Sequence, residues 1–121
     1  MNIGSYLMET TTDLHAAYAH CRQITRKQAK NFYYAFITLP ASKRRATYAT
    51  YAFCRLCDDI TDEALPTKEK VRLLAKVRAN LHNTYAGRSG GPVFTALRDT
   101  AQGFSIPQEY FEEVLRGVEM D

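Results

Sequence analysis

Residues 51–63 read YAFCRLCDDITDE, and this run has the pattern of a helix. At about 3.6 residues per turn, a helix places Asp58 and Asp62 one turn apart on one face, with Arg55 one turn before them. Two like charges at this spacing repel each other, and negative charge near the C-terminal end of a helix opposes the macrodipole. A bound cation would offset both effects, so the run predicts a cation site.

Mg²⁺ is the cation that this run favours. Hard oxygen donors without a His or Cys partner suit Mg²⁺, which typically binds through one or two carboxylates and the phosphate oxygens of a substrate. Basic residues gather at 22–30 and 43–45, which fits an anionic ligand held through a metal. The residues alone therefore suggest a Mg²⁺-dependent site that handles a diphosphate.

A helical wheel of residues 41–63 separates a packing stripe from a polar face. The packing stripe consists of Ala46, Ala49, Phe53, Leu56 and Ile60. The polar face carries Tyr48, Tyr51, Arg55, Asp58, Asp59 and Asp62. Two interpretations of this face remain open: a solvated surface with an Arg55–Asp59 ion pair, or a site. The two tyrosines favour a half-buried cavity wall, because they are large groups to leave in water.

Composition describes one modest domain. The 121 residues are 45% apolar and 24% charged, which is ordinary for a globular chain with a single core. A net charge of +3 without interleaved stacking residues gives no support to nucleic-acid binding. Three cysteines without a disulfide framework indicate a reducing compartment, and we find neither a run of about 18 apolar residues nor a secretory signal. We predict a cytoplasmic protein; peripheral contact with a membrane stays open, because an apolar substrate would favour it.

The rest of the chain is predicted to be helical, so the expected fold class is all-α. The predicted helices cover about 14–30 after the capping residues 11–13, 31–39 up to Pro40, 41–62, 67–86 between Thr67 as cap and Gly87 as stop, a segment from Pro92, and a last one from about 105. In the 67–86 helix we expect Val71, Leu74, Val77 (or Arg78), Leu81 and Tyr85 to face the core. The pair Cys54-x-x-Cys57 lies inside a helix without a second Cys pair, so two small core cysteines are preferred to a zinc or redox motif.

Together with its neighbours, the run 51–63 resembles the first aspartate-rich motif of squalene/phytoene synthases. These are all-α trans-isoprenyl diphosphate synthases that condense two prenyl diphosphates head to head. The run 30–36, KNFYYAF, resembles the family's first substrate-binding run, and Leu39-Pro40 before a basic, Ala-rich helix start resembles the next element. The order and spacing fit across the whole chain. The Asn-Phe-Tyr-Tyr variant looks closest to bacterial squalene and presqualene diphosphate synthases of the hopanoid type.

The resemblance implies roles for individual residues. Asp58 and Asp62 would ligate Mg²⁺, Arg55 would contact the diphosphate, and Tyr51 would line the cavity beside it. The stretch that would hold a prenyl diphosphate head consists of Gln28, Ala29, Lys30 and Asn31. Phe32 would face the prenyl chain. At Ala29 the family often has a serine, so one hydroxyl contact is missing.

The family's second aspartate-rich motif would lie beyond Asp121, and nothing in residues 64–121 replaces it. The apolar pattern of the last helix also still runs at 118–120, which favours a chain cut from a longer one over a frayed final helix. We therefore expect residues 1–121 to form a single partial domain, the N-terminal segment of the family's helical bundle. It would be inactive alone, while the parent enzyme would make squalene, presqualene diphosphate or phytoene.

Two other functions remain as alternatives. One is a squalene-synthase-like helical domain that acts as a non-catalytic assembly or scaffold protein; an intact Asp58/Asp62 pair argues against it, since a scaffold has no need for clustered acids. The other is a small helical nucleic-acid-binding module. Substrate chain length, final product, any nicotinamide requirement and oligomeric state do not follow from the sequence.

Overall fold

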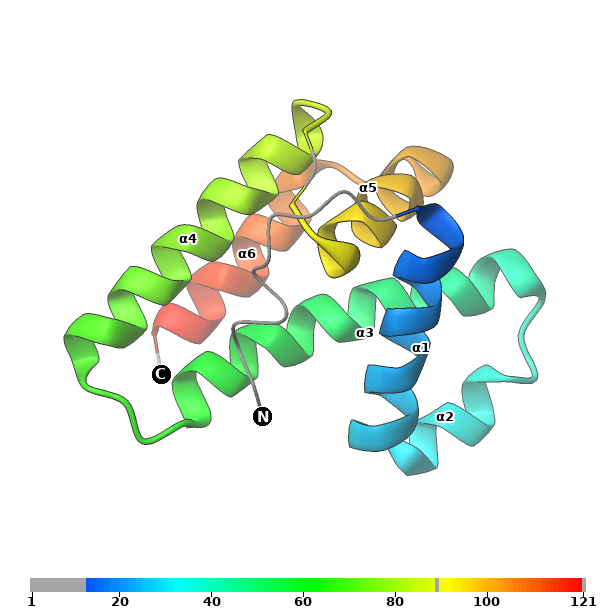
Figure 1. Ribbon diagram of the computed structural model, residues 1–121, viewed down its shortest axis with the longest axis horizontal. Coiled ribbons are helices and arrows are strands. Elements are labelled where there is room, and N and C mark those ends of the chain that lie inside the picture. The colour runs from blue at the N-terminus through cyan, green and yellow to red at the C-terminus, as the bar shows by residue number, and fades with distance from the viewer. Residues whose placement is uncertain (1–12, 89, 121) are drawn as a thin grey trace.

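The computed structural model describes residues 13–88 and 90–120, apart from the side chains of Asn31 and Phe32. Within these ranges all regular secondary structure is helical, which confirms the predicted all-α class. The helices, drawn in Figure 1, are α1 (Leu14–Gln28), α2 (Lys30–Phe36), α3 (Ala41–Asp62), α4 (Thr67–Tyr85), α5 (Pro92–Phe104) and α6 (Gln108–Glu119). The central helix α3 begins and ends at the predicted residues.

The first two helices are separated by one residue. Asp13 caps α1, since its carboxylate accepts the Ala16 N–H at 2.8 Å; residues 11 and 12 lie outside the described part. At Ala29 the backbone leaves the helical region, with φ −131° and ψ 52°, and α2 then starts in a new direction. The helical form of 30–36 confirms the choice of helix over strand.

The sequence predicts the C-terminal end of α4 correctly and the N-terminal cap wrongly. Thr67 as cap is wrong: Pro66 occupies the capping position, Thr67 is the first helical residue, and no side chain caps this end. Gly87 as stop is confirmed. Its φ is +86°, its N–H donates to Thr84 O at 3.2 Å, and the Arg88 N–H donates to Asn83 O at 2.8 Å. This hydrogen-bond pair is the Schellman motif, which favours glycine at that position.

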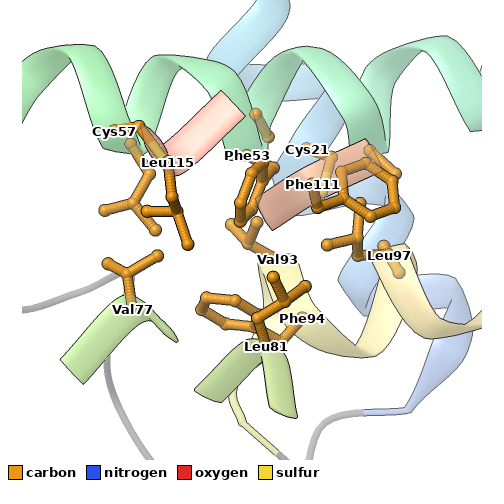
Figure 2. Packing of buried hydrophobic residues seen from close by; sticks show 14 of the residues in the cluster. Cys21, Phe53, Cys57, Val77, Leu81, Val93, Phe94, Leu97, Phe111 and Leu115 are labelled. Carbon is orange, nitrogen blue, oxygen red and sulfur yellow. The ribbon is translucent and has the colours of Figure 1, made fainter. Parts of the chain in front are cut away.

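The core forms around α3, which packs against α1, α4, α5 and α6 (Figure 1). The predicted packing stripe is largely correct, because Ala49, Phe53, Leu56 and Ile60 are fully buried, while Ala46 is half-buried. The Phe53 ring meets Phe94 of α5 edge-on at 6.2 Å between centroids and Phe111 of α6 at 5.3 Å, as Figure 2 shows from close by. One aromatic side chain of α3 therefore joins three helices.

The predicted apolar face of α4 is wrong at one position. Val71 is 62% exposed, and Leu73 is buried in the core. The reason is that α3, α5 and α6 all pack against α4, so its buried face is set by three neighbours and extends beyond one predicted stripe. The other predicted residues of that face are buried or half-buried.

The cysteines are free thiols. Cys57 is fully buried in the core cluster that also contains Leu115 (Figure 2), and Cys54 is half-buried. Burial raises the pKa of Cys57 and Cys54 and raises that of Cys21 to about 12, so these thiols stay protonated at neutral pH. A packing role for the pair agrees with the prediction. None of the described helices is long and apolar enough to cross a membrane.

Candidate functional site

Four of the predicted site residues share one face of α3. Tyr51, Arg55, Asp58 and Asp62 follow one another at spacings of four, three and four residues along an unbroken helix, so they form a stripe. We call these four residues the aspartate stripe. Asp58 and Asp62 are exposed, whereas Tyr51 and Arg55 are half-buried. The stripe therefore presents two carboxylates to solvent next to a cation and an aromatic ring.

The C-terminal turn of α3 concentrates negative charge. It holds Asp59 and Asp62 with Asp58 just before them, and it has no basic residue of its own. Lys70 of α4 reaches this end and donates to the Thr61 carbonyl at 2.8 Å. That bond satisfies a backbone acceptor that the end of the helix leaves open. The Lys70 ammonium thus donates to a backbone carbonyl of this turn.

The predicted polar face is wrong at Asp59 and Tyr48, because both residues are buried, at 5% and 2% exposure. The Tyr33 ring of α2 stacks on Tyr48 at 6.0 Å between centroids, with 19° between the ring planes, and so covers it. Asp59 turns inward to Arg55, with 2.9 Å between Oδ1 and Nε. The ion pair anticipated for a solvated surface thus exists, but its carboxylate is inside the protein.

Charge and burial shift the pKa values of Asp59 and Arg55 in opposite directions. Burial raises the pKa of Asp59, and the Arg55 guanidinium opposes that rise. At Arg55, burial works to lower the pKa, but Asp59, Tyr51 and Asp58 together raise it above its usual value. Arg55 is therefore a permanent cation whose neighbours include both a buried and an exposed carboxylate.

Tyr51 also lines a groove of about 580 Å³ beside the N-terminal half of α3. The groove is formed by Leu39, Lys43, Ala46, Thr47, Thr50, Tyr51, Thr100, Phe104 and Ile106. The hydroxyls of Thr47 and Thr50 donate to the carbonyls of Lys43 and Ala46, at 2.8 and 2.9 Å. Because these hydroxyls bond within the protein, the groove wall is mostly apolar. Tyr51 stands where this apolar groove meets the charged part of the stripe.

The stretch 28–32 lies apart from the carboxylates. Gln28 is half-buried at the end of α1, Ala29 is buried, and Lys30 is exposed. Lys30 lines a depression of about 560 Å³ together with Gln23, Arg26 and Lys27. The side chains of Asn31 and Phe32 lie outside the described residues.

The distance along α3 separates the two predicted parts of the site. The contact of Tyr33 with Tyr48 brings α2, which packs against α1, to the N-terminal half of α3. Tyr48 is ten residues before Asp58, which is about 15 Å along the axis at 1.5 Å per residue. The structure brings the stripe together on one face and puts the 28–32 stretch beside the other half of the helix.

The donor set of the stripe is compatible with Mg²⁺. Among the described residues, no group of three or more His, Cys, Asp or Glu side chains is arranged to hold a metal ion. Asp58 and Asp62 offer two exposed carboxylates, and Mg²⁺ commonly takes one or two carboxylates with waters and substrate phosphates completing its shell. The pair fits a Mg²⁺ ion whose other ligands come from a diphosphate, water or further protein groups.

Part of the groove could not be predicted from the sequence. Thr100, Phe104 and Ile106 come from α5 and the turn after it, far from α3 in the chain. Their place depends on how α5 packs, which local periodicity does not report. The sequence indicated the burial of Asp59 only weakly. Arg55 precedes it by four residues, a spacing at which two helical side chains can pair.

Comparison with known proteins places this site in context. A family model described as squalene/phytoene synthase matches residues 25–121. The chain is 38% identical over 110 residues to the phytoene synthase of Mycobacterium tuberculosis, covering 91% of this chain and 36% of that protein. It is 32% identical over 114 residues to the phytoene synthase of Arthrospira platensis, covering 94% and 37%.

A solved structure is similar over nearly the whole chain. The squalene synthase HpnC from Alicyclobacillus acidocaldarius matches with a TM-score of 0.81 and 28% identity, covering 98% of this chain and 43% of that one. The chain spans a little over a third of the length of these two curated relatives. The range that the family model matches contains the four positions of the aspartate stripe.

Proposed function

Because the chain belongs to the squalene/phytoene synthase family, we propose that it forms part of a prenyl transferase that condenses two prenyl diphosphates head to head. The names of its relatives, phytoene synthase and squalene synthase, support this reaction class. Farnesyl or geranylgeranyl diphosphate would be the substrate, and squalene, presqualene diphosphate or phytoene the product.

One observation carries the proposal: an exposed pair of carboxylates continues directly into an apolar groove along a single helix. Asp58 and Asp62 are exposed, Arg55 precedes them by one turn, and Tyr51 belongs to both the stripe and the groove. A prenyl diphosphate has the same two-part character, with a charged head and a long hydrocarbon chain. The order of residues along α3 therefore matches the order of groups in the substrate.

The residues of this chain would bind the two parts of the substrate differently. The Arg55 guanidinium would bind phosphate oxygens, for which its planar fork of donors is well suited. Asp58 and Asp62 would hold Mg²⁺, which when bound stabilises negative charge on a departing diphosphate. Tyr51 and the apolar groove wall would exclude water from the allylic cation and offer it an aromatic face.

We propose that residues 1–121 are a partial domain, with the second metal-binding wall supplied by the rest of the family fold. Two carboxylates are a small part of what two substrates require, so the chain alone would bind a prenyl diphosphate weakly and would not turn it over. Turnover of farnesyl diphosphate by the purified 121-residue chain would contradict this part of the proposal.

The exposed carboxylates favour the enzyme over a non-catalytic scaffold. A scaffold that retained the fold would gain nothing from two exposed acids at the negative end of a helix, where they destabilise it. An enzyme needs these groups accessible to a metal and a substrate. Binding of a substrate analogue separates the two functions.

The test is calorimetric titration of the chain with a non-hydrolysable farnesyl diphosphate analogue, with and without Mg²⁺. We expect binding that needs Mg²⁺ and that weakens about tenfold or more in Asp58→Ala and in Asp62→Ala. Glu69→Ala is the matched control, because Glu69 pairs with Arg72 on the surface of α4 and belongs to no part of the site. Equal binding by all four proteins would reject the proposed function.

A further inference from the structure

Asp59 differs from the other acids of its run in burial and in partner. Its side chain is 6% exposed, while Asp58 and Asp62 are exposed. Its Oδ1 lies 2.9 Å from Arg55 Nε, and its Oδ2 is buried without a hydrogen-bond partner among the described residues. A buried carboxylate is costly unless it is paired, so Arg55 is what allows Asp59 to be there.

The ion pair holds the Nε end of the arginine by charge and leaves the other end accessible. Arg55 Nε is buried and makes no hydrogen bond with the described residues, so its 2.9 Å contact with Asp59 Oδ1 is electrostatic. The side chain as a whole is 32% exposed, so the exposed part lies elsewhere on the side chain. Helical side chains normally lean toward the N-terminus. Pairing with a residue four positions later draws Arg55 the other way, toward the turn that carries Asp58 and Asp62.

The stability of the helix does not explain this arrangement. For an isolated helix, an acid four residues before a base is the better order, and here the base comes first. The acid also lies in the last turn, where the macrodipole disfavours it. An ion pair between residues four apart on a helix contributes little, and burial of the carboxylate adds a desolvation cost. A role in orienting Arg55 explains why a buried acid occupies this position although it does not stabilise the helix.

We infer that Asp59 is a positioning residue that holds the Arg55 guanidinium in place beside Asp58 and Asp62, so that its outer nitrogens face a diphosphate. This inference rests on the proposed function for the identity of the ligand, whereas the restraint on Arg55 itself does not. Asp59 contacts neither metal nor substrate in this account, and its whole effect passes through Arg55.

The first measurement follows Arg55 in the ligand-free chain by the ¹⁵N heteronuclear NOE of its Nε–Hε group. We expect Arg55 to be ordered in the unsubstituted protein and mobile in Asp59→Ala, while Arg78 is unchanged. Glu112→Ala is the matched control, since it removes an acid 3.2 Å from the Nε of Arg78, an arginine that Glu119 holds as well. It should leave Arg55 ordered. An Arg55 that is equally ordered in Asp59→Ala would overturn the inference.

The second measurement is a double-mutant cycle with inorganic diphosphate and Mg²⁺ as the probe, followed by NMR titration. Asp59→Ala should weaken binding about tenfold when Arg55 is present and by less than about twofold in an Arg55→Ala background. A purely structural role for Asp59 would weaken binding equally in both backgrounds, and that result would overturn the inference. Should Asp59→Ala not fold, Asp59→Asn has the same shape, lacks the charge and permits both comparisons.

The two measurements keep the inference distinct from the proposed function. If diphosphate shifts no signal near Arg55 or Asp58 in the unsubstituted chain, the proposed function fails for this chain. The order of the Arg55 Nε–Hε group then decides the positioning role without any ligand.

Discussion

The Tyr18 hydroxyl donates a hydrogen bond to Asp99 Oδ2 at 2.6 Å and lies 3.0 Å from Thr100 Oγ1. This contact joins α1 to α5, and the Arg45 guanidinium of α3 lies over the Tyr18 ring at 5.5 Å from its centroid. Three helices that are distant in the chain therefore meet at one phenol. Thr100 also lines the groove, so the same contact fixes part of the groove wall.

Removing that hydroxyl should destabilise the fold. Tyr18→Phe loses a hydrogen bond to a carboxylate, and we expect a loss of about 2 kcal/mol in the free energy of unfolding, measured by urea denaturation. Tyr110→Phe is the control, because Tyr110 is 62% exposed on α6 and should change stability by less than about 0.5 kcal/mol. Equal stability of the Tyr18→Phe and Tyr110→Phe proteins would show that the α1–α5 contact contributes nothing.

Alkaline pH should destabilise the protein through buried acids that resist ionisation. Burial raises the pKa of Cys21 from 9.0 to about 12, and burial followed by the Asp99 hydrogen bond raises that of Tyr18 from 10.0 to about 12. Above pH 9 the unfolded chain has lost the Cys21 proton that the folded chain keeps, so stability falls as pH rises. The stability that the protonated Cys21 thiol contributes is complete below pH 9 and is lost progressively toward pH 12.

The corresponding measurement is the free energy of unfolding at a series of pH values between 9 and 12. Cys21→Ala removes one of the ionising groups, so its stability should fall less steeply over this interval than that of the unsubstituted protein. Parallel curves would mean that Cys21 ionises in the folded chain as readily as in the unfolded one.

Two glycines should respond to alanine in opposite directions. Gly87 has φ +86°, where an L side chain is strained, so Gly87→Ala should destabilise the protein by about 1–2 kcal/mol. Gly117 lies within α6 with nothing within 4 Å of an added Cβ, so Gly117→Ala should stabilise it by about 0.5–1 kcal/mol. Thermal or urea unfolding of the two variants checks both signs. A stabilising Gly87→Ala would contradict the assignment of the α4 stop, and a destabilising Gly117→Ala would contradict the open space around Gly117.

The accuracy of the sequence predictions depended on whether the deciding contacts were local. The limits of α3 and the face shared by Arg55, Asp58 and Asp62 follow from helical spacing alone, and the structure agrees with both. Tyr48 was assigned to the polar face because its own helix could not reveal that α2 covers it through Tyr33. Thr67 was assigned as a cap from residue type, although Pro66 takes that position in the backbone.

The candidate site was likewise predictable only along one helix. Tyr51, Arg55, Asp58 and Asp62 could be found from their spacing, whereas the groove needs Thr100 and Phe104 from a helix that packs against α3. Asp59 has the sequence neighbours of an exposed acid, and its burial depends on which way Arg55 turns. Contacts between helices and the direction in which a side chain turns depend on the folded structure, so local sequence does not predict them.

The central claim is that Asp58 and Asp62 bind a divalent cation together with a diphosphate. The most direct measurement replaces Mg²⁺ with paramagnetic Mn²⁺ and records line broadening across the amide spectrum with inorganic diphosphate present. We expect broadening centred on residues 58–62 that is absent in the Asp58→Ala/Asp62→Ala double variant. Broadening centred on the acids of α6, such as Glu113, or broadening that the double variant leaves unchanged, would contradict it.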